Sequence, residues 1–328
     1  MLEPYFRTQR GVLYNGDCIE VMKQLPKDSV DLVVTSPPYA DVKKGVIGVE
    51  GNIDKTYKHV DRDVYVDWFV EVGKCIRDVL KPSGSFVLNI DTFYNDDSTR
   101  NLYVYELVIA LVKRANLEFL QDCFWVKKSP IPSGYATQYI RFRSAVEYLF
   151  WFAKDHTQTK TRLKNVCLEP TEACVRSMKR KAEEFGDKRV YQPSGHSSNY
   201  KQAYETMMEH GSTPLNYIFC ATAASDRLKY LEYATMQGIV HPARFPSDLP
   251  EYFILALTDP DDVVMDPFFG SGTVADVATQ TGRRWIGIEL SNQYCRIYKE
   301  YAIKYGIGFV PTLDKFVDDA KEEEGERA

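Results

Sequence analysis

The short segment Ser36-Pro37-Pro38-Tyr39 carries the side chains of this chain that are best suited to chemistry. The residues before it, 31–35, are mainly apolar and β-branched, which predicts a buried strand that ends at the first proline. Two consecutive prolines fix φ twice and remove two N–H donors, so the turn is stiff and extended. It offers a hydroxyl, a carbonyl and an aromatic ring. Because ligands in open α/β sheets bind beyond the carboxyl ends of strands, we predict the active site here.

A glycine-containing junction far downstream has the features of a nucleotide site. The predicted strand 263–266 runs into Asp266-Pro-Phe-Phe-Gly-Ser-Gly-Thr273, which opens a predicted helix over 274–281. Gly270 and Gly272 would let a ligand approach the backbone, and the helix start would point N–H groups at it. Glu289 ends the next predicted strand, where a carboxylate can bind ribose hydroxyls. A tight strand-to-helix turn without a ligand remains the alternative.

The elements that would position these groups alternate between strands and helices. Apolar runs predict strands over residues 12–14, 31–35, 85–91, 117–126, 146–152, 263–266 and 283–289. Helical spacing predicts helices over residues 18–25, 64–81, 102–115, 249–257 and 274–281. Such alternation is typical of a mostly parallel sheet covered on both faces. Asp17 can cap the first helix, so Asp17 and Ser36 would be neighbours at one edge of the sheet.

The charge of the chain is unevenly distributed. The 328 residues have a net charge of −5, yet residues 113–201 contain 17 Lys and Arg against 9 Asp and Glu. A basic middle in an acidic chain suggests a local face for nucleic acid, although a solvated charged surface would give the same balance. The alternation fails from residue 156 to 235, which we interpret as an insertion with Lys179-Arg180-Lys181 at its centre.

Composition excludes several other classes of protein. No run of residues approaches the ~20 apolar residues that span a membrane, and the first residues lack the apolar segment of a signal peptide. The seven cysteines contain no C-x-x-C pair, so neither a disulfide framework nor a zinc site is indicated. We therefore expect a cytoplasmic protein without a metal.

Taken together, Ser36 to Tyr39 and Asp266 to Thr273 resemble the permuted, β-group amino-methyltransferases of DNA. The supporting matches are Gly16-Asp17, Leu80 to Gly84, His241 to Pro246 and Ile286 to Glu289. The resemblance covers most of residues 12–155 and 240–300. It implies an α/β, Rossmann-like methyltransferase fold, with a mostly parallel doubly wound sheet and one antiparallel edge strand.

The resemblance also divides the chain into functional parts. It implies a catalytic half over 1–155, a target-recognition insertion over 156–235 and a cofactor-binding half over 236–313. The acidic composition of residues 314–328 predicts a disordered tail. The implied cofactor is S-adenosylmethionine, held by Asp17, His241, Pro242, Phe245, Asp266, Pro267, Phe268, Gly270, Ser271, Gly272, Thr273 and Glu289. The candidate contacts to double-stranded DNA are Lys127, Lys128, Lys179, Arg180 and Lys181.

The implied reaction is methylation of an exocyclic base amine, whose lone pair is delocalised and weakly nucleophilic. Acceptors at its N–H groups, the Ser36 hydroxyl and the Pro37 carbonyl, can favour the reactive geometry, and the methyl group then moves by direct in-line transfer. The base must be flipped out of the duplex, and Tyr39 can stack on it or merely pack under the next loop. A neutral hydroxyl can accept from the amine of either base, so physical chemistry allows cytosine N4 or adenine N6 as the target. Serine at the first position of the tetrad, Ser36, resembles the pattern of the cytosine-N4 enzymes.

Two alternatives stay open on the sequence, whereas cytosine-C5 methylation is set aside. A nicotinamide-dependent oxidoreductase could use Gly270 and Glu289, but would leave Ser36 to Tyr39 and the basic insertion unexplained. A catalytically silent DNA-binding subunit could retain the fold. Cytosine-C5 chemistry would need a thiolate, and no cysteine occupies a Pro-Cys context. Whether a restriction endonuclease acting on the same site accompanies the enzyme is also open.

Overall fold

The structure is a computed structural model, and it describes residues 2–40, 62–93, 95, 97, 99–130, 142–191, 197–221, 228–236 and 246–307. Residues 41–61, which follow the Ser36–Tyr39 segment and contain a long Gly- and Lys-rich stretch of the sequence, lie outside these ranges. So does the tail predicted to be disordered over 314–328.

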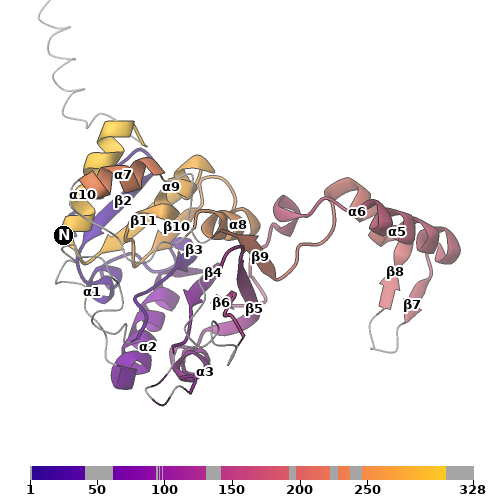
Figure 1. The fold of residues 1–328 in the computed structure, drawn as a ribbon, viewed down its shortest axis with the longest axis horizontal. Coiled ribbons are helices and arrows are strands. Elements are labelled where there is room, and N and C mark those ends of the chain that lie inside the picture. Colours follow the sequence, from indigo (N-terminus) through magenta and orange to yellow (C-terminus); the bar gives the residue numbers. More distant parts are fainter. Residues whose placement is uncertain are drawn as a thin grey trace, which may run out of the picture.

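A nine-stranded sheet forms the body of the described chain, in the order β1-β2-β11-β10-β3-β4-β6-β5-β9 (Figure 1). The strands are β1 (Phe6–Arg7), β2 (Gly11–Asn15), β3 (Val30–Thr35), β4 (Leu80–Ile90), β5 (Glu118–Lys127), β6 (Val146–Ala153), β9 (Tyr217–Cys220), β10 (Val263–Asp266) and β11 (Arg284–Glu289). Strands β2, β11, β10, β3 and β4 run parallel to one another. The predicted mostly parallel sheet is confirmed, with β1 antiparallel at its edge and β6 antiparallel between β4 and β5.

Helices cover both faces of this sheet, as the alternation predicts. On one face, α1 (Cys18–Met22), α2 (Arg62–Val79) and α3 (Tyr103–Ala115) bury their apolar sides. On the other face lie α7 (Leu228–Met236), α8 (Asp248–Leu257), α9 (Thr273–Gln280) and α10 (Asn292–Tyr305). The central strand β3 is buried along its whole length, because its β-branched residues lie under helices on both sides.

A helical arm projects from the body (Figure 1). It consists of α5 (Glu172–Phe185), α6 (Tyr200–His210) and the two-stranded ribbon of β7 (Arg189–Tyr191) and β8 (Ser197–Asn199). The short 3-10 helix η1 (Leu163–Val166) leads into it, and a backbone bridge between Leu168 and Ser212 closes its base. Gly211, at φ +91°, is required there because a Cβ would lie 2.6 Å from the Leu168 carbonyl oxygen.

The segment 156–235 contributes to the body as well as to the arm. Strand β9 pairs with β5 in the large sheet, and α7 buries Tyr230 against Tyr301 of α10. The projecting part is therefore shorter than the interrupted sequence pattern suggests. Among the described residues, no helix is both long and apolar enough to cross a membrane.

Candidate active site

The carboxyl ends of four adjacent parallel strands bring the predicted catalytic and cofactor residues to one edge of the sheet. Ser36 follows β3, Asp266 ends β10, Glu289 ends β11, and Asp17 follows β2. In sequence these groups lie far apart, and only the strand order β2-β11-β10-β3 places them side by side. This edge is where open α/β sheets bind ligands.

The Ser36–Tyr39 turn is fixed from below by the body of the protein. Pro37 is buried, whereas Ser36 and Tyr39 are half-buried. The carbonyl of Pro38 accepts a 2.8 Å hydrogen bond from the Tyr65 hydroxyl of α2. Within the described part of the chain no donor occupies the Pro37 carbonyl, so the turn presents that carbonyl and the Ser36 hydroxyl as possible acceptors.

The hydroxyl of Tyr39 is anchored on the neighbouring strands. It lies 3.1 Å from Oε2 of Glu147 on β6 and 3.4 Å from Oδ1 of Asn89 on β4. Burial raises the pKa of Tyr39 well above its ordinary value and the negative charge of Glu147 adds to this, while a hydrogen bond with Ser36 acts in the opposite direction. Tyr39 is therefore a neutral phenol whose ring orientation is fixed at its hydroxyl end.

A buried hydrogen bond links the catalytic turn to the glycine loop. The hydroxyl of Thr35, the last residue of β3, donates to Oδ1 of Asp266 at 2.6 Å, and the backbone N–H of Phe268 donates to the same oxygen at 3.0 Å. Asp266 is 5% exposed. Burial raises its pKa to about 6, and the two hydrogen bonds oppose that rise.

The glycine loop turns sharply because its glycines adopt the left-handed region. Gly270 has φ +52° and Gly272 has φ +77°. A Cβ on Gly272 would lie 2.3 Å from the Tyr298 ring, and one on Gly287 would lie 2.1 Å from the Phe269 ring. Glycine is therefore required at both positions because the Tyr298 and Phe269 rings pack directly against the backbone.

Glu289 is held by backbone donors on both sides. Its Oε2 accepts from the Gly270 N–H at 2.8 Å, and its Oε1 accepts from the Ser291 N–H at 2.8 Å. Asp17 is likewise fixed, because its carboxylate caps α1 by accepting from Ile19 and Glu20 N–H groups at 2.9 and 3.3 Å. Both acids thus have defined positions at the strand ends.

This set of groups fits the cofactor expected from the sequence. Asp17, Asp266 and Glu289 provide carboxylates for a ligand that carries positive charge and a ribose diol. Phe268 adds an apolar wall, since its ring stacks on Phe69 at 6.1 Å between centroids. The remaining predicted cofactor residues of the loop, Pro267, Ser271 and Thr273, lie in the same turn. His241, Pro242 and Phe245 are outside the described residues.

The two lysines predicted to contact DNA at the end of β5 differ from each other. Lys127 forms a 2.6 Å ion pair with Glu147, and the two side chains are only 18% and 12% exposed. Lys128 is exposed, with its amine 5.7 Å from the Phe219 ring centre. Lys128 is therefore accessible to a phosphate, whereas Lys127 is engaged inside the site.

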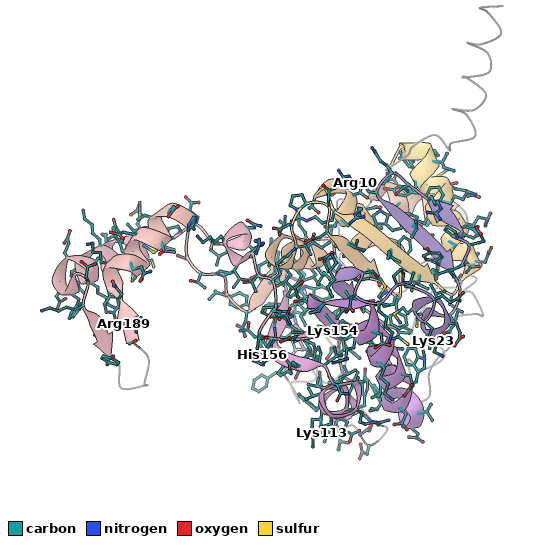
Figure 2. The ribbon with its side chains drawn as sticks, turned by 180° about the vertical axis from the view of Figure 1, so that it is seen from behind. Arg10, Lys23, Lys113, Lys154, His156 and Arg189 are labelled. Carbon is teal, nitrogen blue, oxygen red and sulfur yellow. The ribbon has the colours of Figure 1, made fainter. Side chains whose placement is uncertain are left out.

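The three predicted basic residues of the insertion lie on α5 of the arm. Lys179 and Arg180 are exposed and have no carboxylate partner among the described residues. Lys181 is half-buried, with its amine 5.0 Å from the Tyr200 ring centre. Arg189, which is labelled in Figure 2, lies on the ribbon of the same arm, away from the sheet.

Sequence analysis missed four residues that shape the site: Thr35, Tyr65, Asn89 and Glu147. Their contacts cross between elements that are distant in the chain, so no local pattern indicates them. One feature of the sequence could have indicated Glu147. It is the second residue of β6, which pairs antiparallel with β4, and the start of such a strand lies at the carboxyl ends of the parallel strands.

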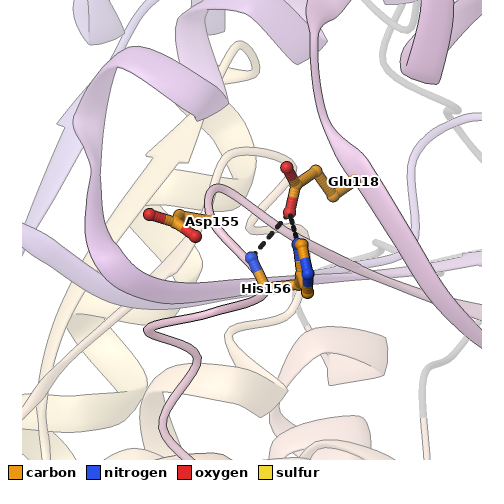
Figure 3. A group of neighbouring side chains, drawn as sticks. All are labelled: Glu118, Asp155 and His156. Atoms are coloured by element: carbon orange, nitrogen blue, oxygen red, sulfur yellow. Dashed lines mark hydrogen bonds and ion pairs between the residues drawn. The ribbon is translucent and has the colours of Figure 1, made fainter.

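One group of possible metal ligands lies at the amino ends of the parallel strands, opposite the strand ends that form the candidate site. The ligand atoms of Glu118, Asp155 and His156 are within 4.8 Å of one another (Figure 3). Oε2 of Glu118 already accepts from the His156 backbone N–H at 2.6 Å and lies 2.7 Å from His156 Nδ1. Asp155 accepts from Thr157 and Gln158. These internal partners account for the cluster without an ion.

The amino-acid sequence of this chain is similar to those of known DNA methyltransferases. A family model described as DNA methylase, N6_N4_Mtase, matches residues 30–300. The chain is 32% identical over 297 residues to the type II methyltransferase M.PvuII of Proteus hauseri, covering 89% of this chain and 83% of that protein. It is 28% identical over 287 residues to M.BglII of Bacillus subtilis, covering 87% and 67%.

Solved structures give the same result. The cytosine-N4-specific PvuII DNA methyltransferase superposes with a TM-score of 0.67 at 27% identity, covering 96% of this chain and 93% of that one. A Thermus thermophilus protein described as a DNA modification methylase, solved with S-adenosylmethionine, superposes with a TM-score of 0.51 at 21% identity, covering 90% and 95%. The predicted α/β methyltransferase fold is confirmed.

Proposed function

The chain belongs to the N6/N4 DNA methylase family, and from that premise we propose that it methylates the exocyclic N4 amine of cytosine in duplex DNA. The methyl donor is S-adenosylmethionine. The observation that carries this proposal is the hydrogen bond from Thr35 to Asp266. It joins β3, which Ser36 follows, to β10, which leads into the glycine loop, so an amine held after one strand meets a ligand held after the other.

Ser36 and Pro37 orient the amine in this proposal. The Ser36 hydroxyl and the Pro37 carbonyl accept from its two N–H groups, and this draws the nitrogen toward the geometry in which its lone pair can react. Bound S-adenosylmethionine supplies an electrophilic methyl group. In the direct transfer the amine nitrogen gains the methyl group and releases one proton to solvent, and S-adenosylhomocysteine leaves, so the protein contributes placement rather than a covalent intermediate.

Tyr39 provides the surface on which the flipped base stacks. Its ring is half-buried and its hydroxyl is anchored to Glu147 and Asn89, so the ring is held before the base arrives. Base–aromatic stacking is worth ~1–3 kcal/mol per base, enough to offset part of the cost of unstacking the duplex.

The assignment of cytosine rather than adenine rests on two observations. Serine occupies the first position of the tetrad, and the similar PvuII enzyme is described as cytosine-N4-specific. Adenine N6 remains the alternative outcome, because a neutral hydroxyl can accept from either amine.

The cofactor-binding residues are also part of the proposal. Glu289 binds the ribose hydroxyls, Asp17 approaches the adenine amine, and Asp266 lies at the methionine end. The loop residues Pro267, Phe268, Gly270, Ser271, Gly272 and Thr273 are proposed to surround that end. His241, Pro242 and Phe245 are proposed to close the pocket there, as the family resemblance of residues 241–246 implies.

Target recognition is assigned to the insertion, and mainly to its projecting arm. Lys179 and Arg180 on α5 are suited to phosphate contacts, since both are exposed and lack carboxylate partners among the described residues. Lys128 is a further candidate at the edge of the sheet. A restriction endonuclease of the same sequence specificity is the proposed partner, because the similar proteins from Proteus hauseri and Bacillus subtilis are named type II methyltransferases.

The cytoplasm is the proposed compartment. All seven cysteines are described, and all seven are free thiols. That state is expected of a protein kept under reducing conditions.

A label-transfer assay tests the proposed reaction. The purified chain is incubated with tritium-labelled S-adenosylmethionine and unmethylated mixed-sequence duplex, and label is expected in the DNA. Tyr39→Ala should reduce the rate strongly without changing cofactor affinity. Preferential binding of NAD over S-adenosylmethionine would instead support the oxidoreductase, and absence of label with an intact duplex would contradict the enzyme.

A further inference from the structure

Glu147 reaches the active site from a strand that the catalytic motif does not include. It is the second residue of β6, which runs antiparallel to both β4 and β5. Because β6 is antiparallel, its first residues lie at the carboxyl ends of β4 and β3, and the Glu147 side chain reaches the Tyr39 hydroxyl at 3.1 Å. The contact joins residues that are 108 positions apart.

This carboxylate is buried and its charge is neutralised. Glu147 is 12% exposed, and its Oε1 pairs with the amine of Lys127 at 2.6 Å. That amine is also 5.1 Å from the Trp125 ring centre. A buried carboxylate is costly unless it is paired and hydrogen-bonded, so the Lys127 contact is what permits a charged acceptor beside Tyr39.

The two oxygens of Glu147 have different partners. Oε1 takes the ion pair with Lys127, while Oε2 faces Tyr39 and the Asn89 side-chain amide, the latter at 3.4 Å. Asn89 is itself fixed, because its amide donates to the Tyr148 carbonyl at 3.0 Å. The carboxylate therefore has one orientation, with one oxygen aimed at the phenol.

We propose that Glu147, held by Lys127, is a positioning residue for Tyr39. By accepting from the phenol hydroxyl it fixes the plane of the ring against which the target base stacks. This inference rests on the proposed function of Tyr39, and it assigns Lys127 to the support of the site rather than to a phosphate of DNA. A hydrogen bond to a charged group contributes ~1.5–3 kcal/mol, which corresponds to a rate effect on the order of 10- to 100-fold.

A double-mutant cycle tests this inference. The single variants Tyr39→Phe and Glu147→Gln and the double variant are compared with the wild type for kcat and for KM of DNA and of S-adenosylmethionine. Each single variant should lower kcat/KM for DNA about 10-fold, with KM for S-adenosylmethionine unchanged. In the Tyr39→Phe background, Glu147→Gln should have almost no further effect, because the hydroxyl it acts through is already absent.

A spectroscopic measurement separates positioning from general stability. A duplex that carries 2-aminopurine at the target position fluoresces more when that base is flipped out of the stack. Its fluorescence should be lower in complex with Glu147→Gln than with the wild type, because a less firmly held Tyr39 ring stabilises the flipped base less. Lys127→Gln should give the same change. Glu118→Gln, the same substitution at the far end of adjacent β5, is the control and should match the wild type.

Independent effects would overturn the inference. If Glu147→Gln lowers kcat/KM by the same factor in the Tyr39→Phe background as in the wild type, Glu147 does not act through the hydroxyl. If Glu147→Gln folds poorly, it is combined with Lys127→Gln so that both charges are removed together. The effect of this combined variant is then compared in the wild-type and Tyr39→Phe backgrounds in the same way. If the wild type is active and the effects of the two substitutions are additive, only the role of Glu147 is contradicted. If the wild type transfers no methyl group to DNA, the proposed function is contradicted as well.

Discussion

The Tyr39 hydroxyl lies 3.1 Å from Oε2 of Glu147, although Tyr39 is in the turn after β3 and Glu147 is on β6, 108 positions away. The catalytic turn is thus completed by a side chain from the antiparallel strand β6. On its other side, Thr35 ties the turn to Asp266 at the end of β10. Three strands therefore define where an amine, a base ring and a methyl donor meet.

Removing the Ser36 hydroxyl should slow the reaction without weakening cofactor binding. Ser36→Ala deletes one of the two acceptors proposed for the amine, and the loss of a neutral hydrogen bond of ~0.5–1.5 kcal/mol lowers kcat by roughly 2- to 10-fold. Ser29→Ala is the matched control. Ser29 precedes the other end of β3, where its hydroxyl donates to the Pro26 carbonyl. Steady-state kinetics check this prediction, which fails if both variants behave alike.

Asp266 should make the stability of the protein depend on pH. Burial raises its pKa to about 6 from 3.8, so the folded state holds this proton more tightly than the unfolded state. The resulting stabilisation is fully present below the unfolded pKa and is lost as pH rises through about 6. The difference corresponds to roughly 3 kcal/mol at most.

The variant Asp266→Asn should therefore be more stable than the wild type at pH 7.5 and no more stable at pH 4. Urea unfolding across this range measures the difference, and a difference that does not vary with pH would contradict the prediction. The same variant should bind S-adenosylmethionine more weakly at pH 7.5, because it lacks a negative charge near the cationic end of the ligand. Calorimetric titration measures that affinity.

Charges on the arm should control the salt dependence of DNA binding. Lys179→Gln with Arg180→Gln removes two exposed cations, and each lost phosphate contact flattens the plot of log K against log salt by ~0.9. Lys181→Gln should act mainly on the arm itself, since Lys181 lies over Tyr200. Lys113→Gln, in the last turn of α3, is the control. An unchanged slope in the double variant would show that these charges are only solvated.

Two glycines with the same backbone conformation should respond differently to alanine. Gly272 and Gly282 have φ +77° and +78°, so both substitutions incur a similar strain of ~1–2 kcal/mol. A Cβ on Gly272 would also lie 2.3 Å from the Tyr298 ring, whereas nothing lies within 4 Å of one on Gly282.

Gly272→Ala should consequently lower the melting temperature more than Gly282→Ala and should also weaken binding of S-adenosylmethionine. Thermal unfolding and calorimetric titration of the two variants provide the comparison. Equal effects on both quantities would mean that the close approach of Tyr298 does not shape the glycine loop.

Local patterns predicted the parts of the site that are continuous in sequence. The prolines of the catalytic turn and the glycines before α9 each dictate their own backbone, so they are visible without the fold. The contacts of Thr35 and Glu147 depend on which strands are neighbours. Strand order is set by packing over the whole sheet, and no single segment carries it.

The arm was predicted as a polar, basic insertion but not as a pair of helices. In α5 no residue is fully buried, and in α6 only Met207 is. Both helices have low overall hydrophobicity, so neither has the apolar content expected of a helix that packs on the core, although the apolar residues of α5 do recur with helical spacing. The helices are stabilised by local devices such as the Thr171 cap and by mutual contacts such as Phe185 with Tyr200. Strand β9 coincides with a short apolar run at Tyr217–Phe219, which the sequence interpretation placed in the insertion rather than in the sheet.

Identification of the methylated nucleoside tests the central claim most directly. An unmethylated random-sequence duplex is incubated with the protein and S-adenosylmethionine, digested to nucleosides and analysed by mass spectrometry against standards. We predict N4-methyldeoxycytidine in the wild-type reaction and its slower accumulation with Ser36→Ala. N6-methyldeoxyadenosine, or unmodified nucleosides alone, would contradict the account.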